Sequence, residues 1–173
     1  MGQRRSSSRV DYTGFFRAEY QAVVRTVELM TGDHDAALDI TQEAFARLYR
    51  HWRRVSRYEA PGAWVRRIAV NLAISHLRRR KVQQRLLPAL ATPVPPPPEK
   101  DDSVLAAVRA LPPSQRAAIV LFYFEDQPTS EVAALLGCSE ATARVHLHRA
   151  RAKLARVLGP DPGVERRRHD VAR

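Results

Sequence analysis

Residues 129–158, TSEVAALLGCSEATARVHLHRARAKLARVL, decide the fold class of this chain, because they contain two helical segments separated by a tight turn. The first segment has apolar residues at Val132 and Leu135, and the turn that follows contains Gly137. Ser139 is placed to cap the second segment, since a serine hydroxyl accepts a backbone N–H at a helix start. This pattern predicts a helix-turn-helix.

The second helix of this motif has two contrasting sides. Its apolar residues recur at steps of three and four and predict a buried stripe: Ala143, Leu147, Ala150, Leu154 and Leu158. The opposite side carries the side-chain types that contact guanine edges, thymine methyl groups and phosphates, namely Arg144, Val145, His148, Arg149 and Arg151. A recognition helix for the major groove of duplex DNA is therefore predicted, and a solvated basic face on an ordinary core helix is the alternative.

The composition supports a polyanionic partner. The 173 residues carry a formal net charge of +11, which favours nucleic acid or an anionic surface. No apolar stretch approaches the roughly 20 residues that span a bilayer, and residues 1–10 lack the apolar run of a secretory signal. The single cysteine, Cys138, excludes an intrachain disulfide and suits a reducing compartment. We therefore expect no membrane insertion and a cytoplasmic location.

A proline-rich segment divides the chain. Residues 88–103, PALATPVPPPPEKDDS, contain four consecutive prolines and few apolar residues, which is typical of an extended linker. We expect an all-α fold with two small helical domains, residues 10–87 and 104–158, joined by this linker. Residues 159–173 are expected to form a flexible tail.

Three helices are predicted in the first domain. The apolar stripe of the first is Phe16, Tyr20, Val23, Val27 and Met30, and that of the second is Ile40, Ala44, Leu48 and Trp52. Gly32 is expected to end the first helix and Asp33 to cap the second. After a polar connector at 53–59, Pro61 suits the first turn of a third helix, in which Trp64, Ile68 and Leu72 are expected to face inward.

A second face of the third helix is polar. Arg67, Asn71, Ser75 and Arg78 follow one another at steps of four, four and three, and Arg79, Arg80 and Lys81 extend this basic region. Residues 60–85 contain no acid, so this face suits a nucleic-acid strand better than ordinary solvation. Trp52, Tyr58 and Trp64 have the ring surface to stack on unpaired bases, and core packing is the alternative for each.

The ordered combination of these segments resembles the extracytoplasmic-function sigma factors, small two-domain members of the sigma-70 family. Residues 29–52, which include Asp39-Ile40-Thr41-Gln42-Glu43, resemble the family's helix that binds core RNA polymerase. Residues 60–81 resemble its helix that reads and melts the −10 element. Residues 111–154 resemble its domain that binds the −35 element.

The resemblance implies a role for each group of residues. Asp39, Gln42 and Glu43 would contact core RNA polymerase. The melted −10 strand would be held by Arg67, Asn71, Ser75, Arg78, Arg79, Arg80 and Lys81. The −35 duplex would be read by Arg144, Val145, His148 and Arg149, with Arg151 and Lys153 on flanking phosphates. Many family members are held inactive by an anti-sigma factor, so such a partner is possible here.

Two other functions compete with this interpretation. An autonomous helix-turn-helix regulator would bind a palindromic duplex with half-sites about one helical turn apart, which a long linker and a basic 60–81 helix do not favour. An enzyme is the weaker alternative. The Asp33-His34-Asp35 run does not converge on one ion, and no phosphate-cradling glycine loop or nucleophile motif is present. We therefore expect no catalytic residues, no metal and no cofactor.

Overall fold

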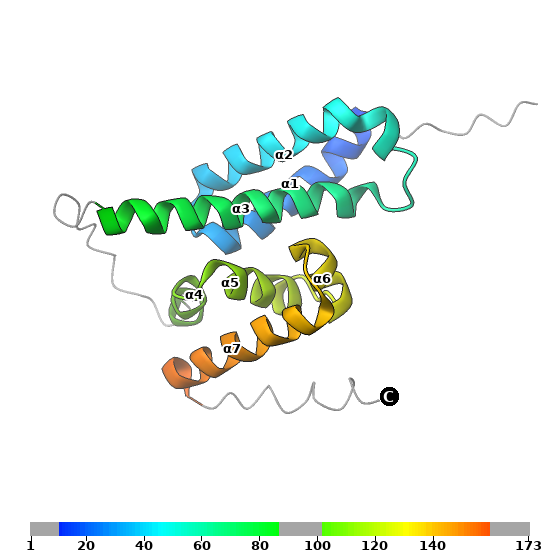
Figure 1. Ribbon diagram of the computed structural model, residues 1–173. Coiled ribbons are helices and arrows are strands. Elements are labelled where there is room, and N and C mark those ends of the chain that lie inside the picture. Colours follow the sequence, from blue (N-terminus) through cyan, green and yellow to red (C-terminus); the bar gives the residue numbers. More distant parts are fainter. Residues whose placement is uncertain (1–10, 87–101, 160–173) are drawn as a thin grey trace, which may run out of the picture. The chain divides into compact units, whose positions relative to one another are not determined.

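The structure, a computed structural model, describes residues 11–86 and 102–159 (Figure 1). Regular structure in this part of the chain is helical throughout, and the chain divides into two compact units after Leu77. The predicted all-α fold with two small helical units is therefore confirmed. No helix within these residues combines the length and apolar content needed to cross a membrane. Most of the expected linker, and the expected tail beyond Gly159, lie outside the described residues.

The first unit is built on α1 (Tyr12–Thr31), α2 (His34–Val55) and, as far as Leu77, α3 (Pro61–Leu86). Gly32 ends α1 in the left-handed region, with φ 70°, and its N–H donates to the carbonyl oxygen of Glu28 at 2.7 Å. The carboxylate of Asp33 accepts the N–H of Ala36 at 3.1 Å and so caps α2. Both predicted helix boundaries are confirmed, and together they make the turn that packs α1 against α2.

The core of the first unit is aliphatic in the middle and aromatic at one end. Val27, Met30 and Leu48 are fully buried between α1 and α2. At the other end, the ring of Trp52 lies 5.0 Å from Phe15 between centroids, and Tyr12 contacts the same indole at 5.3 Å. Trp52 therefore belongs to the core cluster, which is the alternative stated for it above.

The inward face of α3 differs from the prediction. Its buried residues are Val65, Ala69, Val70, Ala73, Ile74 and Leu77, whereas Trp64, Ile68 and Leu72 are only half-buried. The prediction was wrong by about one residue, or about 100° around the helix. Apolar residues occupy both faces, so spacing alone does not choose between them. An ion pair between Arg66 and Glu19 at 3.1 Å joins α3 to α1 in the observed rotation.

The connector between α2 and α3 is also shorter than predicted. α2 continues to Val55, whose side chain is fully buried, so the connector comprises 56–60 instead of 53–59. The polar residues around Val55 suggest an earlier end for α2. Burial of the Val55 side chain in the core stabilises the additional helical turn. α3 begins at Pro61 as predicted.

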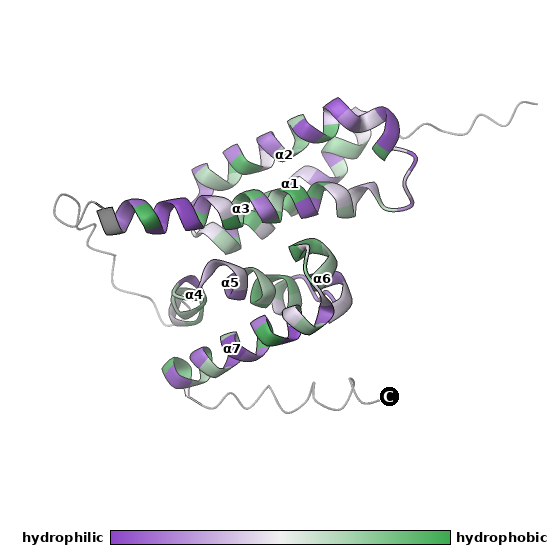
Figure 2. Ribbon diagram, in the orientation of Figure 1, coloured by the Kyte–Doolittle hydropathy of each residue, from purple (hydrophilic) through white to green (hydrophobic). Residues whose placement is uncertain are grey.

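The second unit contains α4 (Asp102–Arg109), α5 (Pro113–Ile119), a π-helical turn η1 (Val120–Phe124), α6 (Thr129–Leu136) and α7 (Glu140–Leu158). Because α4 begins at Asp102, the last two residues of the expected linker are helical. The core of this unit includes Val108, Leu111, Ile119, Leu121, Val132, Leu135 and Leu147. Figure 2 shows apolar residues along α5 and α6, which pack with α7.

The helix-turn-helix formed by α6 and α7 is confirmed. Gly137 adopts φ 68° after α6, and the N–H of Cys138 donates to the carbonyl of Ala133 at 3.0 Å. The hydroxyl of Ser139 accepts the N–H of Thr142 at 3.2 Å and caps α7. The predicted buried stripe of α7 holds for Ala143, Leu147 and Ala150. Leu154 is only half-buried and Leu158 is 41% exposed, so the predicted burial of Leu158 was wrong.

Candidate nucleic-acid interface

The outward face of α7 carries most of the predicted base-reading residues. Arg144, Val145, His148 and Arg149 are all exposed. At about 100° per residue, Val145, His148 and Arg149 lie roughly opposite the buried Leu147 stripe, whereas Arg144 lies nearer its edge. Val145 is 45% exposed, and an apolar side chain within a polar face suits contact with a thymine methyl group.

The charge on Arg144 is partly occupied within the helix. Its guanidinium forms an ion pair with Glu140 one turn earlier. Arg149 is exposed, with the side chain that suits bidentate contact to guanine. These two arginines of one helix therefore differ in what they have available for DNA.

Arg156 is an exposed cation on α7 that the sequence prediction missed. It follows Val145, Arg149 and Ala152 at steps of four, three and four, so it lies on the same outward stripe. That spacing was the signal available in the sequence. Base contacts come from the N-terminal part of a recognition helix, so Arg156, about three turns in, suits a phosphate.

Arg151 is directed into its own unit. Its Nε donates to the hydroxyl of Tyr123 at 2.8 Å, and its guanidinium lies 5.1 Å from the Phe122 ring centroid and 5.5 Å from that of Tyr123. The half-buried side chain thus ties α7 to η1. Lys153, the other predicted phosphate ligand, is exposed.

Two titratable side chains of the helix-turn-helix are held in their neutral form. Burial, together with the nearby charge of Arg149, lowers the pKa of His146 below its ordinary value, so this imidazole adds no charge to α7 at neutral pH. Burial raises the pKa of the Cys138 thiol in the turn, which keeps it protonated. The positive charge on α7 therefore comes from arginine and lysine.

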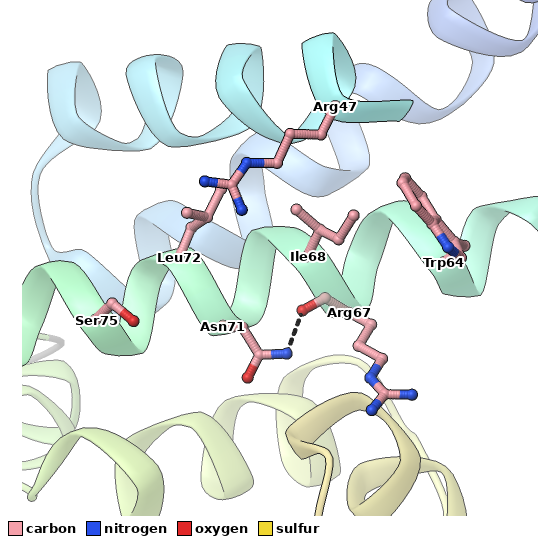
Figure 3. A pocket seen from close by; sticks show the side chains of 7 residues that line it. All are labelled: Arg47, Trp64, Arg67, Ile68, Asn71, Leu72 and Ser75. Carbon is pink, nitrogen blue, oxygen red and sulfur yellow. Dashed lines mark hydrogen bonds between the residues drawn. The ribbon is translucent and has the colours of Figure 1, made fainter. Parts of the chain in front are cut away.

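The polar face of α3 lies beside a pocket in the first unit. Arg67, Asn71, Ser75 and Arg78 are exposed, as predicted. A pocket of about 470 Å³ opens between α2 and α3, lined by Arg47, Trp64, Arg67, Ile68, Asn71, Leu72 and Ser75 (Figure 3). Three of the residues predicted for −10 DNA are thus brought together with apolar side chains and a cation from another helix.

The basic residues that follow on α3 do not share one face. Arg79, Arg80 and Lys81 are all exposed. Successive residues turn by about 100°, so Arg78 continues the Arg67–Asn71 line, Lys81 and Arg79 flank it at about 60° and 100°, and Arg80 lies on the opposite side. One strand lying along the polar face would therefore meet Arg78 before the other three.

Two aromatic residues remain available near this face. Trp64 lines the pocket, and its ring meets His51 edge-on at 5.9 Å between centroids. Tyr58 is 41% exposed in the connector, with Arg54 at 6.0 Å from its ring centroid. Both keep ring surface for stacking, unlike Trp52.

The acidic face of α2 is exposed, as predicted for a protein-binding surface. Asp39, Gln42 and Glu43 all lie outward, and Glu43 forms an ion pair with Arg47 at 2.5 Å. Tyr49, which the prediction missed, is 65% exposed and lies two turns beyond Gln42. The sequence did indicate this exposure, because Tyr49 is an aromatic residue outside the buried Ile40–Leu48 stripe.

Metal binding finds no support among the residues at 11–86 and 102–159. No three His, Cys, Asp or Glu side chains there gather as ligands of one ion would. In the Asp33-His34-Asp35 run, Asp33 caps α2, and His34 turns instead toward Glu28 at 3.1 Å.

These features define a class: a two-domain helical protein that combines a helix-turn-helix with a second helical unit bearing a basic face and an acidic face. Residues 15–82 match the family described as Sigma-70 region 2, and residues 101–154 match Sigma-70, region 4. The chain is 31% identical over 153 residues to an RNA polymerase sigma-E factor of Streptomyces antibioticus, covering 86% of this chain and 85% of the relative. The sigma-E factor of Streptomyces coelicolor is 28% identical over 155 residues, 86% of each chain. The chain belongs to the sigma-70 family of RNA polymerase sigma factors, among the extracytoplasmic-function members.

The fold is also found in a solved structure. The sigma factor RpoE of Bartonella quintana, determined in complex with the anti-sigma factor NepR, matches with a TM-score of 0.69 and 22% identity, covering 88% of this chain and 99% of that one. Regions 2 and 4 together favour a sigma factor role over an autonomous helix-turn-helix regulator.

Proposed function

We propose that this sigma factor acts in the cytoplasm as the promoter-specificity subunit of RNA polymerase, with three surfaces in three roles. The face of α2 binds core polymerase, α3 holds the opened −10 strand, and α7 reads the −35 duplex. The observation that carries this proposal is the separation of charge within the first unit. Exposed acids lie on the N-terminal half of α2, as far as Glu43, whereas the exposed charges on its C-terminal half and on α3 are all basic.

Binding to core polymerase is assigned to Asp39, Gln42, Glu43 and Tyr49. Carboxylates on an otherwise basic protein are repelled by DNA phosphates and attracted by a basic protein surface. An exposed tyrosine beside them supplies the aromatic anchor that often dominates interface energetics.

Promoter binding is assigned to α3 and α7. An unpaired base has lost its stacking partners at a cost of a few kcal/mol, which ring surface and apolar contacts offset. On α3, Arg67 and Arg78 supply charge for phosphates. On α7, Arg149 and Val145 reach base edges in the major groove, and Lys153 and Arg156 suit phosphates.

Run-off transcription on genomic fragments tests the proposal, using purified core polymerase with and without this protein. We expect discrete transcripts only when both are present, and their 5′ ends locate the −10 and −35 elements. A duplex shift by the protein alone, with no transcript when core is added, would instead establish a regulator. An anti-sigma partner, of the kind seen with the Bartonella quintana protein, stays a prediction that co-purification tests.

A further inference from the structure

The inward face of α3 changes character toward its N-terminal end. Along most of the helix this face is apolar, and it includes Val70, Ala73 and Leu77. At about 100° per residue, Arg66 and Gly62 lie on the same face, one and two turns before Val70. The buried stripe of α3 therefore ends in a cation and a glycine instead of apolar side chains.

Glu19 of α1 contacts both of these residues. Its carboxylate accepts a hydrogen bond from Nη2 of Arg66 at 3.1 Å, and the side chains are partly buried, 26% exposed for Glu19 and 36% for Arg66. A β-carbon on Gly62 would lie 3.3 Å from Oε2 and 3.4 Å from Cδ of Glu19, so glycine leaves the carboxylate its space. The other acid of α1, Glu28, pairs with His34 instead. Glu19 thus joins α1 to the first turns of α3.

The rotation of α3 depends on such a contact, because apolar residues on this helix do not choose between two rotations. A second apolar line, which includes Trp64 and Ile68, is displaced from the buried line by one residue, or about 100°. If the second line turned inward, Arg66 would move away from Glu19 and the polar face would turn with the helix. A charged hydrogen bond is directional, so the ion pair opposes this alternative rotation.

We propose that Glu19, Gly62 and Arg66 form a latch that sets the rotation of α3, and thereby the direction in which its DNA-binding face points. Glu19 and Arg66 are positioning residues, which act through Arg67 and Asn71 and do not contact DNA themselves. The proposal rests on the proposed function, because it takes the opened −10 strand as the ligand of α3. When the binding-competent rotation is only partly populated, the apparent affinity falls by that fraction.

The test uses holoenzyme assembled from the full chain and core polymerase, with a labelled single strand that carries the −10 element mapped by run-off transcription. Glu19→Ala should weaken strand binding about three- to tenfold, which corresponds to a binding-competent population of about a third to a tenth. Affinity for core polymerase should not change, because α2 is not altered.

The sign of this effect distinguishes the latch from general electrostatics. Removal of an acid from a DNA-binding protein tightens binding when only long-range charge matters. Glu28→Ala, on the same helix and with the same change in net charge, is the matched control, and it should bind the strand as tightly as the wild-type protein or slightly more tightly. Only Glu19→Ala should weaken binding.

Gly62 supplies a second test, whose result depends on Glu19. In the wild-type protein, Gly62→Ala should displace the carboxylate and weaken strand binding. In the Glu19→Ala background the added methyl group has room and alanine favours a helix, so Gly62→Ala should cause no further loss. Thermal unfolding followed by circular dichroism checks that each variant is folded at the temperature of the binding measurement.

An apolar pair separates positioning from charge. Apolar side chains of similar size can replace an ion pair while keeping the contact between two helices. The double variant Glu19→Leu, Arg66→Met should therefore bind the strand more tightly than Glu19→Ala, although it lacks the cation. If Arg66 instead contacts a phosphate, the double variant would bind more weakly than Glu19→Ala, and the latch would be overturned.

The remaining outcomes separate the two proposals. If Glu19→Ala binds the strand as tightly as the wild-type protein, or if Gly62→Ala has the same effect in both backgrounds, the latch assignment is overturned while transcription from the mapped promoter still supports the sigma factor. If wild-type protein and core give no transcript from any template, the proposed function fails and the latch assignment fails with it.

Discussion

Individual arginines of α7 are predicted to act differently although they share one helix. Arg149 is exposed and lies on the outward stripe. A bidentate contact to one guanine is worth about 1–3 kcal/mol of discrimination, so Arg149→Ala should weaken binding to the best −35 sequence by that amount. Holoenzyme binding to a panel of single-base −35 variants measures this effect. An equal loss on every sequence would show that Arg149 contacts phosphate instead.

Arg151 is expected to position α7 and not to bind phosphate, because its guanidinium is held by Tyr123 and the Phe122 ring. Each phosphate contact contributes about 0.9 to the slope of log affinity against log salt concentration. Arg151→Gln should therefore leave this slope of holoenzyme–promoter binding unchanged, and the matched variant Lys153→Gln should reduce it by about one.

Stability gives an independent check on Arg151. Tyr123→Phe removes one hydrogen bond and should lower the free energy of unfolding of the second unit by about 0.5–1.5 kcal/mol. A reduced salt slope for Arg151→Gln, together with an unchanged stability for Tyr123→Phe, would return Arg151 to the phosphate ligands.

At the scale of elements, the turn between α6 and α7 depends on glycine. Gly137 has φ 68°, where a β-carbon costs about 1–2 kcal/mol, so Gly137→Ala should destabilise the helix-turn-helix by about that much. Gly14→Ala is the control, since Gly14 is helical and a β-carbon there meets nothing within 4 Å. Its effect should be neutral or slightly stabilising. Hydrogen exchange of the α7 amides distinguishes the two, and equal protection in both variants would show that the turn does not need glycine.

The elements also show which features a sequence can predict. Local chemistry fixes caps and turns, so Gly32, Asp33 and Ser139 were predicted correctly from residue type alone. The rotation of α3 was not predicted, because apolar residues surround much of that helix and the choice depends on long-range contacts such as Arg66 with Glu19. η1 was also not predicted, because a π-helical turn has no periodic sequence pattern of its own.

In the candidate site, too, features within one helix were predictable from the sequence and contacts between helices were not. Exposed polar stripes such as Arg67, Asn71 and Ser75 were predictable, because a stripe without acids is visible in one helix. The pocket was not, since it needs Arg47 from α2 beside residues of α3. The contact of Arg151 with Tyr123 was not predictable for the same reason, because Tyr123 lies 28 positions earlier in the chain. Residue spacing within one element does not predict contacts between elements.

At the scale of the whole molecule, binding to polymerase and binding to DNA are predicted to be separable by charge. Glu43 and Glu140 are both exposed acids that pair with an arginine four residues later, one in each unit. Changing either to lysine has the same effect on net charge and removes the same kind of local ion pair, which is worth about 0.3–0.5 kcal/mol on a helix surface.

Only Glu43 lies on the surface proposed for core polymerase, so Glu43→Lys should weaken holoenzyme formation without DNA by about ten- to a hundredfold, because it places like charges together at the interface. Glu140→Lys should leave that affinity unchanged, which makes it the control for net charge and for folding. Titration of labelled core polymerase measures both. Equal affinities for the two variants would remove the α2 face from the interface, and equal losses would show that core polymerase responds only to the charge of the whole protein.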